Sequence, residues 1–430
     1  MILFLVDRVN ERWVYTLDFV FSKRGINYYV TSEVEQFKNS KLPKVNLCKS
    51  GDYGGLKFRV SDLLYDQYIK EYVITQEVFA NQKCLAFNGI PDLFASIFFV
   101  LSRMEEYILN ERDHHERFSA KSSFQKRFDW LEQCICDRWA ICLINQLNEK
   151  LDIELKVELA DTKVIPTFDI DNVFAYQFKE GSRKWLSIAR DVAKLDKNRI
   201  RERKRVLKNN SADPYDTFSY IESISDRGFD VRIFWLTGEY AQFDKNVSIE
   251  HDGHQEVIRK MAEKAQIGIH PSYKSNQLKF NVKIELNNLQ NVLGQSQKVT
   301  ASRQHYLKID MPSTYKNLLK YGLKEDYSMG FADQAGFRMG TAHSVNWFDL
   351  SQNTISNLVL KPFAYMDGSL NEYMHLTPQE AMAKVAELYK EVRTYGGDFI
   401  FIWHNETIGD YKKWKGWNEV LEFTLDLKKT

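Results

Sequence analysis

The sequence has almost no excess charge of either sign. Its 430 residues include 59 Lys and Arg against 58 Asp and Glu, which leaves a net charge of +1. Proteins that bind nucleic acid or anionic membranes along their length carry a clear basic excess, so neither partner is expected here. Proline and glycine are also scarce, with 8 and 20 residues, and this composition excludes disordered and collagen-like chains.

The sequence also lacks a hydrophobic run long enough to span a bilayer. The longest apolar stretch, from Leu93 to Leu101, is far shorter than the roughly 20 residues that a membrane-spanning helix needs. The apolar start of the chain, MILFLV, is followed by Asp7 and Arg8 and has no basic region before it, unlike a signal peptide. We therefore expect MILFLV to be a buried strand, and the protein to be cytoplasmic with no membrane insertion.

Cysteine is rare, and no CxxC pair is present. The five cysteines all lie in the first third of the chain, at positions 48, 84, 134, 136 and 142. Cysteines in this pattern are typical of small apolar side chains in a reducing compartment, and a Cys-based zinc site is not expected. Seven of the nine histidines follow residue 250, so the cysteines and most of the histidines lie in different parts of the chain.

Length and hydrophobic content indicate a large globular protein. With 44% hydrophobic and 14% aromatic residues, 430 residues are enough for two or three domains. Residues 1–156 mix strand and helix patterns, including an apolar helix expected over Pro91–Leu109 and an amphipathic helix expected over Trp130–Leu151. We expect these residues to form a smaller mixed α/β N-terminal domain whose role the sequence leaves open.

From about residue 157 onward, strand and helix patterns alternate. Alternation of this kind predicts a parallel sheet or a (β/α) barrel, here over residues 157–430. Some strands are continuous apolar runs, as in a sheet covered on both faces. The seven expected strands are Val164–Ile170, Val231–Thr237, Ile267–Pro271, Val299–Leu307, Tyr321–Met329, Leu358–Tyr365 and Asp398–Trp403. Helices are expected between them, over Trp185–Lys208, Tyr215–Asp226, His254–Ala265, Leu286–Leu293, Thr314–Lys320 and Pro378–Val392.

One of these helices carries a dense run of basic residues. The run Arg199-Ile-Arg-Glu-Arg-Lys-Arg205 is typical of a solvated helix face, and we prefer that interpretation to a nucleic-acid site.

Polar residues with catalytic chemistry follow several of the expected strands. Catalytic residues collect at the C-terminal rim of a parallel barrel, where several strands contribute them. Carboxylates and imidazoles together suit a divalent metal such as zinc, which makes water nucleophilic near neutral pH. A second carboxylate could accept a proton and a distant histidine could donate one, so the residues alone predict a metal-dependent hydrolase of an amide or ester. The residues concerned are Asp169, Asp171, His270, Arg303, His305 and His404.

At these positions the chain resembles the polysaccharide deacetylase family, the NodB-homology domain of carbohydrate esterase family 4. Thr167-Phe-Asp-Ile-Asp171 is similar to its T-F-D-D motif, His270-Pro-Ser-Tyr-Lys274 to H-[ST]-x-x-H, Arg303-Gln-His-Tyr306 to R-x-P-[YF], and Ile402-Trp-His404 to L-x-H. The resemblance covers roughly residues 160 to 430 and implies a distorted seven-stranded (β/α) barrel. The N-terminal part resembles, more loosely, the domain that precedes a divergent branch of such deacetylases.

The resemblance implies a role for each matched residue. Asp169 corresponds to the general base, and Arg303 to the residue that tethers it. Asp171 and His270 correspond to metal ligands. The backbone N–H of Tyr306 corresponds to a group that stabilises the oxyanion, and His404 to the general acid that protonates the departing amine.

The chain departs from the family at the second metal histidine, which is Lys274 here. His305 occupies the proline position of the third motif and is our candidate for the third ligand; the alternative is a histidine that hydrogen-bonds Asp169. Asp169 and Asp171 are two residues apart, so both side chains point to one face of a regular strand. The roles of base and ligand could therefore be exchanged between them.

The family's fourth motif has no clean match. The segment Ala332–Gly340 stands in its region, and Asp333 and Arg338 within it are predicted to contact substrate, against the alternative of a structural turn. Trp403 is also predicted to contact substrate. His251 and His254 have the spacing of a ligand pair but precede a helix away from the strand ends, so a structural role is favoured for them.

The resulting hypothesis is a metal-dependent deacetylase. It would hydrolyse the amide of an N-acylated sugar or glycan precursor with zinc, or with cobalt, manganese or nickel in its place. Two alternatives stay open: hydrolysis of a non-sugar amide on the same barrel, and a degenerate carbohydrate-binding protein without catalysis. The sequence leaves the oligomeric state open.

Overall fold

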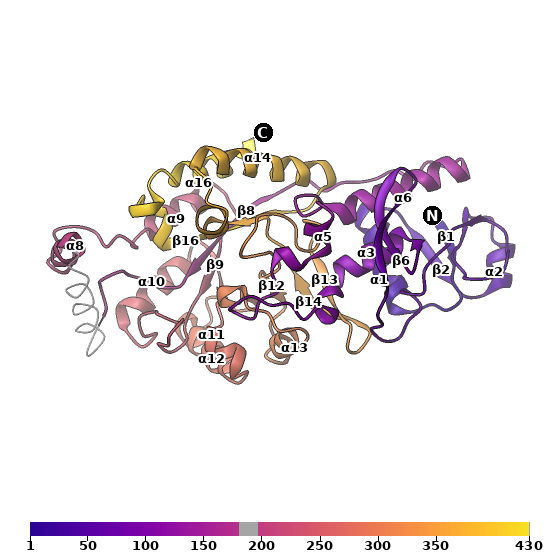
Figure 1. Ribbon diagram of the computed structural model, residues 1–430. Coiled ribbons are helices and arrows are strands. Elements are labelled where there is room, and N and C mark those ends of the chain that lie inside the picture. Colours follow the sequence, from indigo (N-terminus) through magenta and orange to yellow (C-terminus); the bar gives the residue numbers. More distant parts are fainter. Residues whose placement is uncertain (180–196, 430) are drawn as a thin grey trace.

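The computed structural model describes residues 1–179 and 197–429 of the chain (Figure 1). Their strands form a four-stranded sheet and a three-stranded sheet in the N-terminal region and a nine-stranded sheet in the remainder. The expectation of a mixed α/β fold is confirmed. No helix in this part of the chain is both long and apolar enough to cross a membrane. The five cysteines are free thiols, four of them buried.

The N-terminal region begins with the strand expected for MILFLV. This strand, β1, is buried along its whole length and lies between two parallel neighbours, in the sheet order β2-β1-β3-β4. A separate antiparallel sheet, β5-β6-β7, follows it. The strands are β1 (Ile2–Leu5), β2 (Tyr28–Thr31), β3 (Lys44–Asn46), β4 (Leu56–Lys57), β5 (Ile74–Phe79), β6 (Gln82–Phe87) and β7 (Ile90–Pro91).

The apolar helix expected over Pro91–Leu109 is divided in two. Asp92 caps the first part by accepting the Ala95 N–H, and the chain leaves the helix at Arg103, whose φ is +55°. This break lets the buried Arg103 guanidinium reach Glu105 and Glu106. The helices of the N-terminal region are α1 (Glu11–Val20), α2 (Val34–Asn39), α3 (Leu93–Leu101), α4 (Glu105–Ile108), α5 (Phe124–Arg127) and α6 (Ile135–Leu151).

The nine-stranded sheet is parallel except for one edge strand. Its order is β13-β14-β12-β11-β10-β9-β8-β16-β15, and only the β13–β14 pair is antiparallel. Strands β8 and β16, with seven and six residues, are mainly apolar and lie side by side. The strands are β8 (Val164–Ile170), β9 (Arg232–Trp235), β10 (Gln266–Ile269), β11 (Ala301–Ser302), β12 (Glu325–Asp326), β13 (Val345–Asp349), β14 (Thr354–Leu360), β15 (Tyr365–Met366) and β16 (Phe399–His404).

All seven expected strands overlap observed ones, with three differences. The strand expected over Tyr321–Met329 is reduced to the two residues of β12. The strand expected over Val299–Leu307 is reduced to β11, because the chain turns at Arg303 into a short 3-10 helix, η3 (His305–Leu307). The strand expected over Leu358–Tyr365 is split between β14 and β15, which pair with different neighbours. Strand β13 was not expected.

Helices flank the sheet on both sides. In Figure 1, α14 and α16 lie along the top of the molecule, while α10 to α13 lie below and to the left. The expected helices are found with shifted ends, except that the first half of Trp185–Lys208 lies outside the described residues. The helices are α8 (Lys197–Leu207), α9 (Phe218–Asp226), α10 (Asp252–Ala262), α11 (Tyr273–Gln277), α12 (Asn281–Leu293), α13 (Ser313–Lys320), α14 (Pro378–Tyr395), α15 (Asn405–Ile408) and α16 (Asn418–Asp426).

Closure of the sheet into a seven-stranded barrel stays a prediction. Among the described residues, the edge strands β13 and β15 are not paired with each other, so the hydrogen-bonded ladder is open.

The N-terminal region and the large sheet pack through a shared aromatic cluster. Phe348 of β13 contacts Tyr15 of α1 and Phe98 of α3, with ring centroids 5.3 Å and 4.9 Å away. A buried ion pair joins the same two parts: Arg338 binds Glu106 through Nε at 2.9 Å and Nη2 at 2.6 Å. Apolar packing and buried charge pairing therefore hold the two regions against each other.

Candidate active site

The site is built at the carboxyl ends of the parallel strands. Asp169 lies in β8, and Asp171 directly follows that strand. The strand runs between β9 and β16, and all seven of its residues are buried. Because parallel strands end at the same edge of a sheet, polar residues that follow several of them come together there.

Three histidines converge on Asp171. His270 follows β10, and its Nε2 lies 3.2 Å from Asp171 Oδ1. His305, in η3, brings its Nε2 to 3.4 Å from Asp171 Oδ2. His404, the last residue of β16, places its Nε2 3.8 Å from the same Oδ2. Asp171 is thus the centre of the cluster.

The two closest histidines are each held through Nδ1. His270 Nδ1 donates to the backbone carbonyl of Arg303 at 2.6 Å, and His305 Nδ1 donates to the Asp244 carboxylate at 2.8 Å. With Nδ1 protonated, the neutral ring keeps its lone pair on Nε2, the atom that faces Asp171. Such a partner on the far side of the ring is characteristic of metal-binding histidines.

Asp244 is itself fixed from behind. It is buried, and it accepts the backbone N–H groups of Tyr273 at 2.7 Å and Lys274 at 3.2 Å. Burial would raise the pKa of Asp244, but the hydrogen bond and charge of His305 and these N–H groups lower it overall. An ionised Asp244 fixes the orientation of the His305 ring.

Asp171, His270 and His305 could together hold a metal ion. One ligand atom from each lies within 4.8 Å of the others. Asp171 Oδ1 is buried and makes no hydrogen bond within the described part of the chain. Buried polar atoms normally have a partner, and a bound cation would supply one here. One carboxylate and two imidazoles form a donor set that zinc accepts. These residues therefore fit the metal expected from the sequence.

Lys274, at the position of the second histidine in the motif that this segment resembles, is directed elsewhere. It is exposed, and its Nζ lies 3.7 Å from Glu239. His305, which the sequence analysis proposed as the third ligand, contacts Asp171. It does not contact Asp169, which was the alternative.

The charges of the cluster depend on one another. Burial would raise the pKa of Asp171, but His305 and His270 lower it well below its ordinary value. Burial would lower the pKa of His305, yet Asp171 and Asp244 raise it to about 9. In the absence of a cation, a proton on His305 balances the Asp171 charge, and a bound cation would take over that role.

Asp169 is tethered by a buried arginine. Arg303 Nη1 donates to Asp169 Oδ1 at 2.7 Å, and its Nε donates to the Tyr327 carbonyl at 3.0 Å. The guanidinium is fully buried and lies 4.4 Å from the centroid of the Phe234 ring. Asp169 Oδ2 is 3.9 Å from His270 Nε2, so this carboxylate faces the metal-capable cluster without joining it.

His404 is paired with a buried carboxylate. Its Nδ1 donates to Asp367 Oδ1 at 2.8 Å, and the other oxygen of Asp367 accepts Thr407 Oγ1 at 2.6 Å. Burial would lower the pKa of His404, but Asp367 and then Asp171 raise it well above its ordinary value. The imidazole therefore holds a proton that it can donate from Nε2 toward the cluster.

Asp169, Asp171 and the three histidines line one cleft of about 550 Å³. Tyr306, whose φ is +58°, borders it, and Glu406 and Tyr373 contribute further polar groups. The N-terminal region supplies Arg117, which donates to the Tyr306 carbonyl at 3.0 Å and to the Tyr373 hydroxyl at 3.3 Å. A side chain from outside the large sheet therefore forms part of the cleft wall.

The three residues predicted to contact substrate do not line this cleft. Arg338 is buried in its ion pair with Glu106. Asp333 accepts the Ala120 N–H at 3.2 Å beside a separate small cavity. Trp403 is fully buried in β16, because its side chain points to the opposite side of the strand from its neighbour His404. His254, assigned a structural role, is buried and accepts from Trp235 Nε1 at 2.7 Å.

Part of the chain matches a known family. Residues 2–152 match a family of unknown function, DUF7033. No curated protein matches the sequence. Among solved structures, a Mycobacterium smegmatis protein provisionally described as a polysaccharide deacetylase aligns with a TM-score of 0.39 and 16% identity, covering 62% of this chain and 89% of its own. This similarity is too low to support a conclusion about fold or function.

Sequence reasoning missed Asp244, Asp367 and Arg117. Asp244 lies in a loop and Asp367 in the helical turn that follows β15. Neither belongs to a motif, and each acts through a histidine that is distant in sequence. Arg117 belongs to a part of the chain where no chemistry was expected. For Asp367 a weak signal exists, since it closely follows β15 at the same edge of the sheet.

Proposed function

We propose that this protein is a metal-dependent hydrolase that removes an acyl group, most simply acetyl, from an N-acylated sugar. The observation that carries the proposal is the convergence of three units on one cleft. They are the Asp171–His270–His305 cluster, the Asp169–Arg303 pair and the His404–Asp367 pair.

Asp171, His270 and His305 would hold the metal, most simply zinc, with cobalt, manganese or nickel as substitutes. When bound, a divalent cation at this place supplies Lewis acidity, which polarises a carbonyl and makes water a nucleophile near neutral pH.

Asp169 acts as the general base. Its Oδ1 is bound to Arg303, which fixes the orientation of the carboxylate, while Oδ2 faces the cluster. A carboxylate in this position accepts the proton of the attacking water as the water adds to the acyl carbon. Arg303 thus acts through Asp169 and has no contact with the substrate in this proposal.

His404 acts as the general acid. Its proton is retained because Asp367 stabilises the imidazolium, and Nε2 faces the cleft. It delivers that proton to the departing amine, which cannot leave as an anion. The backbone N–H of Tyr306 would contribute to stabilising the oxyanion, since η3 borders the cleft.

The sugar substrate is supported by the motif resemblance and by aromatic residues along the cleft, Tyr215, Tyr373 and Trp414 among them. The hydrolytic groups themselves would act equally on a non-sugar amide, which stays the second candidate. The complete Asp–His–His cluster argues against a degenerate protein without catalysis.

The proposal includes a (β/α) barrel over residues 157–430 after a separate N-terminal domain. Closure is supported by the segment between β14 and β15. The Lys361 N–H donates to the backbone carbonyl of Asp326 in β12. Three residues later, the Ala364 N–H donates to the backbone carbonyl of Ile400 in β16. The boundary near residue 157 is supported by the DUF7033 match, which ends at residue 152.

The test measures metal content and acetate release together. Purified protein loaded with zinc should contain one zinc per chain and release acetate from N-acetylated oligosaccharides. Asp169→Asn should keep the zinc and lower kcat by about 10²–10⁴-fold. Asp171→Asn should lose the zinc.

Three outcomes would contradict the proposal in different ways. Zinc loss in Asp169→Asn with zinc retained in Asp171→Asn would show that the two aspartates have exchanged roles. Absence of stoichiometric metal in the wild type would refute the metallohydrolase. Bound metal without acetate release from sugars would favour the non-sugar amide.

A further inference from the structure

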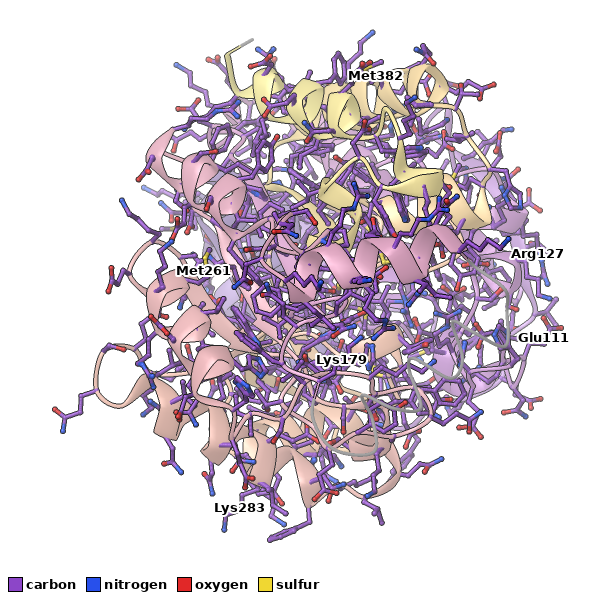
Figure 2. All side chains as sticks on the ribbon, turned by 90° about the vertical axis from the view of Figure 1, so that its left-hand side faces the viewer. Glu111, Arg127, Lys179, Met261, Lys283 and Met382 are labelled. Atoms are coloured by element: carbon purple, nitrogen blue, oxygen red, sulfur yellow. The ribbon has the colours of Figure 1, made fainter. Side chains whose placement is uncertain are left out.

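A second, open groove lies beside the candidate active-site cleft. It has a volume of about 950 Å³ and is lined mainly by α8. Arg199, Tyr411 and Lys412 line both the groove and the cleft, so the two are continuous at this edge. Figure 2 faces α8, which crosses the middle of the view with Lys179 labelled below it.

The groove concentrates positive charge in a protein whose net charge is only +1. The helix α8 has the sequence KNRIRERKRVL, with six basic residues and one acidic residue. Four of the basic side chains that line the groove are exposed: Arg201, Lys204, Arg205 and Lys208. Clustered like charges in a concave surface focus the electrostatic potential and attract ions of opposite sign.

Glu202 is the one acidic residue among the described residues that line the groove, and it is hydrogen-bonded within the protein. Glu202 accepts hydrogen bonds from the hydroxyls of Tyr176 and Tyr411, each at 2.6 Å. Arg203 packs above the Tyr176 ring, 4.9 Å from its centroid. These contacts fix α8 against the C-terminal segment at the mouth of the cleft, and they turn the Glu202 carboxylate toward the tyrosines.

We propose that this groove binds negatively charged groups, phosphate or carboxylate, carried by the same sugar whose acyl group is hydrolysed in the cleft. The inference rests on the proposed function, because it assigns the groove to the substrate of that site. Arginine offers a planar pair of N–H donors that matches both anions, and lysine adds a mobile positive charge. The substrate class is therefore an anionic N-acylated glycan or a phosphorylated N-acyl sugar, rather than a neutral polymer.

Nucleic acid is the other polyanion that a basic groove could attract. The sugar is favoured because the groove opens into the cleft, where a bound anion would hold an attached sugar close to Asp169 and His404. The chain as a whole also lacks the basic excess that is typical of proteins that bind nucleic acid.

The test compares charged and neutral probes by calorimetric titration of the full-length, zinc-loaded protein. The probes are the neutral N-acetylglucosamine tetramer, a tetrasaccharide alternating N-acetylglucosamine and glucuronate, N-acetylglucosamine 1-phosphate and a short DNA duplex. At low salt, at least one charged sugar should bind about tenfold or more tightly than the neutral tetramer. Raising the salt concentration should remove this preference, because it screens exposed charges. Whichever charged sugar binds more tightly identifies the anion as carboxylate or phosphate.

The variant Lys204→Glu/Lys208→Glu reverses two exposed charges on α8 and should abolish the preference for charged sugars. The matched control is Lys283→Glu/Lys320→Glu. Lys283 lies on α12 at the lower edge of Figure 2, and both control side chains are exposed and outside the groove. The control should bind as the wild type does. Thermal unfolding of both variants confirms that each remains folded.

Equal affinity for charged and neutral sugars, or tighter binding of the DNA duplex than of either charged sugar, would overturn the inference. So would an unchanged preference in the α8 variant. If the wild type releases acetate but shows no charge preference, only the groove assignment fails. If charged sugars bind through α8 but no acetate is released from any N-acetylated probe, the proposed function fails instead.

Discussion

At the residue scale, the site depends on which nitrogen of each histidine is occupied. His270, His305 and His404 all donate from Nδ1, to a backbone carbonyl, to Asp244 and to Asp367 respectively. All three therefore present Nε2 to Asp171. Lys274, which stands where the resembled motif has its second histidine, lies outside this cluster, while His305 approaches Asp171 from the adjacent strand end.

Replacing His305 should remove the metal. His305→Ala deletes one of three ligands, so we expect zinc affinity to fall by about 100-fold or more, beyond what loss of an outer partner causes. Zinc affinity is measured by competition with a chromogenic chelator. Lys274→Ala is the control and should bind zinc as the wild type does, because Lys274 is exposed and points away. Full zinc affinity in His305→Ala would show that the third ligand lies elsewhere.

Replacing Asp367 should change the pH dependence of the reaction. The Asp367 carboxylate raises the pKa of His404, so Asp367→Asn lowers it. A general acid works only while protonated, and the alkaline limit of kcat should therefore move to lower pH, by about one to three units. The measurement is the pH profile of kcat. Asp230→Asn, an exposed aspartate paired with Arg232, should leave the profile unchanged. An alkaline limit that does not move would exclude His404 as the acid.

At the element scale, the short helix η3 is held by a segment of the N-terminal region. Arg117 binds its Tyr306 carbonyl, and His115 packs against the Tyr306 ring with centroids 4.6 Å apart. Asp113 fixes Arg117 in turn through Nε at 2.7 Å. Since η3 carries both His305 and Tyr306, the N-terminal region positions part of the candidate site from outside the sheet.

Removing Arg117 should weaken catalysis more than substrate binding. A hydrogen bond to a charged group contributes about 1.5–3 kcal/mol, and its loss loosens η3, whose Tyr306 N–H is proposed to stabilise the oxyanion. We expect Arg117→Ala to lower kcat by about tenfold with a smaller change in KM, as measured by steady-state kinetics. Arg127→Ala removes an exposed arginine of the same region that packs on Phe124, and it should have no effect. Unchanged kinetics in Arg117→Ala would remove the N-terminal region from the site.

At the scale of the whole molecule, a buried charge network joins the two regions. Glu106 lies between Arg103 and Arg338, with contacts of 2.8 Å and 2.6 Å. Burial would raise the pKa of Glu106, but Arg338 and then Arg103 lower it to about 2. A carboxyl whose pKa is lowered by folding stabilises the fold above its unfolded pKa, and this stabilisation is lost as the pH falls toward 2.

Removing this charge should destabilise the protein. Glu106→Gln leaves two buried guanidinium groups short of a partner, so the free energy of unfolding should fall by about 3–5 kcal/mol at neutral pH. The acid-induced loss of stability between the ordinary pKa of 4.5 and the folded value of about 2 should also become smaller. Both effects are measured by urea unfolding across this pH range. Glu132→Gln breaks a more exposed pair with Lys384 and should change stability by about 0.5 kcal/mol or less. Equal stability of the two variants would contradict the role given to the network.

Local pattern predicted the strands best where burial is continuous. β8 was predicted with its observed ends, because all seven of its residues are buried. β11 was predicted too long, because Arg303 leaves the strand to reach Asp169, a contact across 134 residues that no local pattern contains. The break at Arg103 has the same origin, since its partner network includes Arg338 far along the chain.

The sequence by itself determined the α/β alternation and the polar residues that follow the strands. Apolar periodicity and strand-end chemistry are local properties, so both were readable without coordinates. Only the tertiary structure decided which side chains meet. It placed Asp244 against His305 and Asp367 against His404. It also brought Arg117 to the cleft wall and α8 to the mouth of the cleft. Trp403 and Arg338, in contrast, are buried away from the cleft. Those choices depend on packing between segments distant in sequence, where burial and charge pairing act and local pattern carries no information.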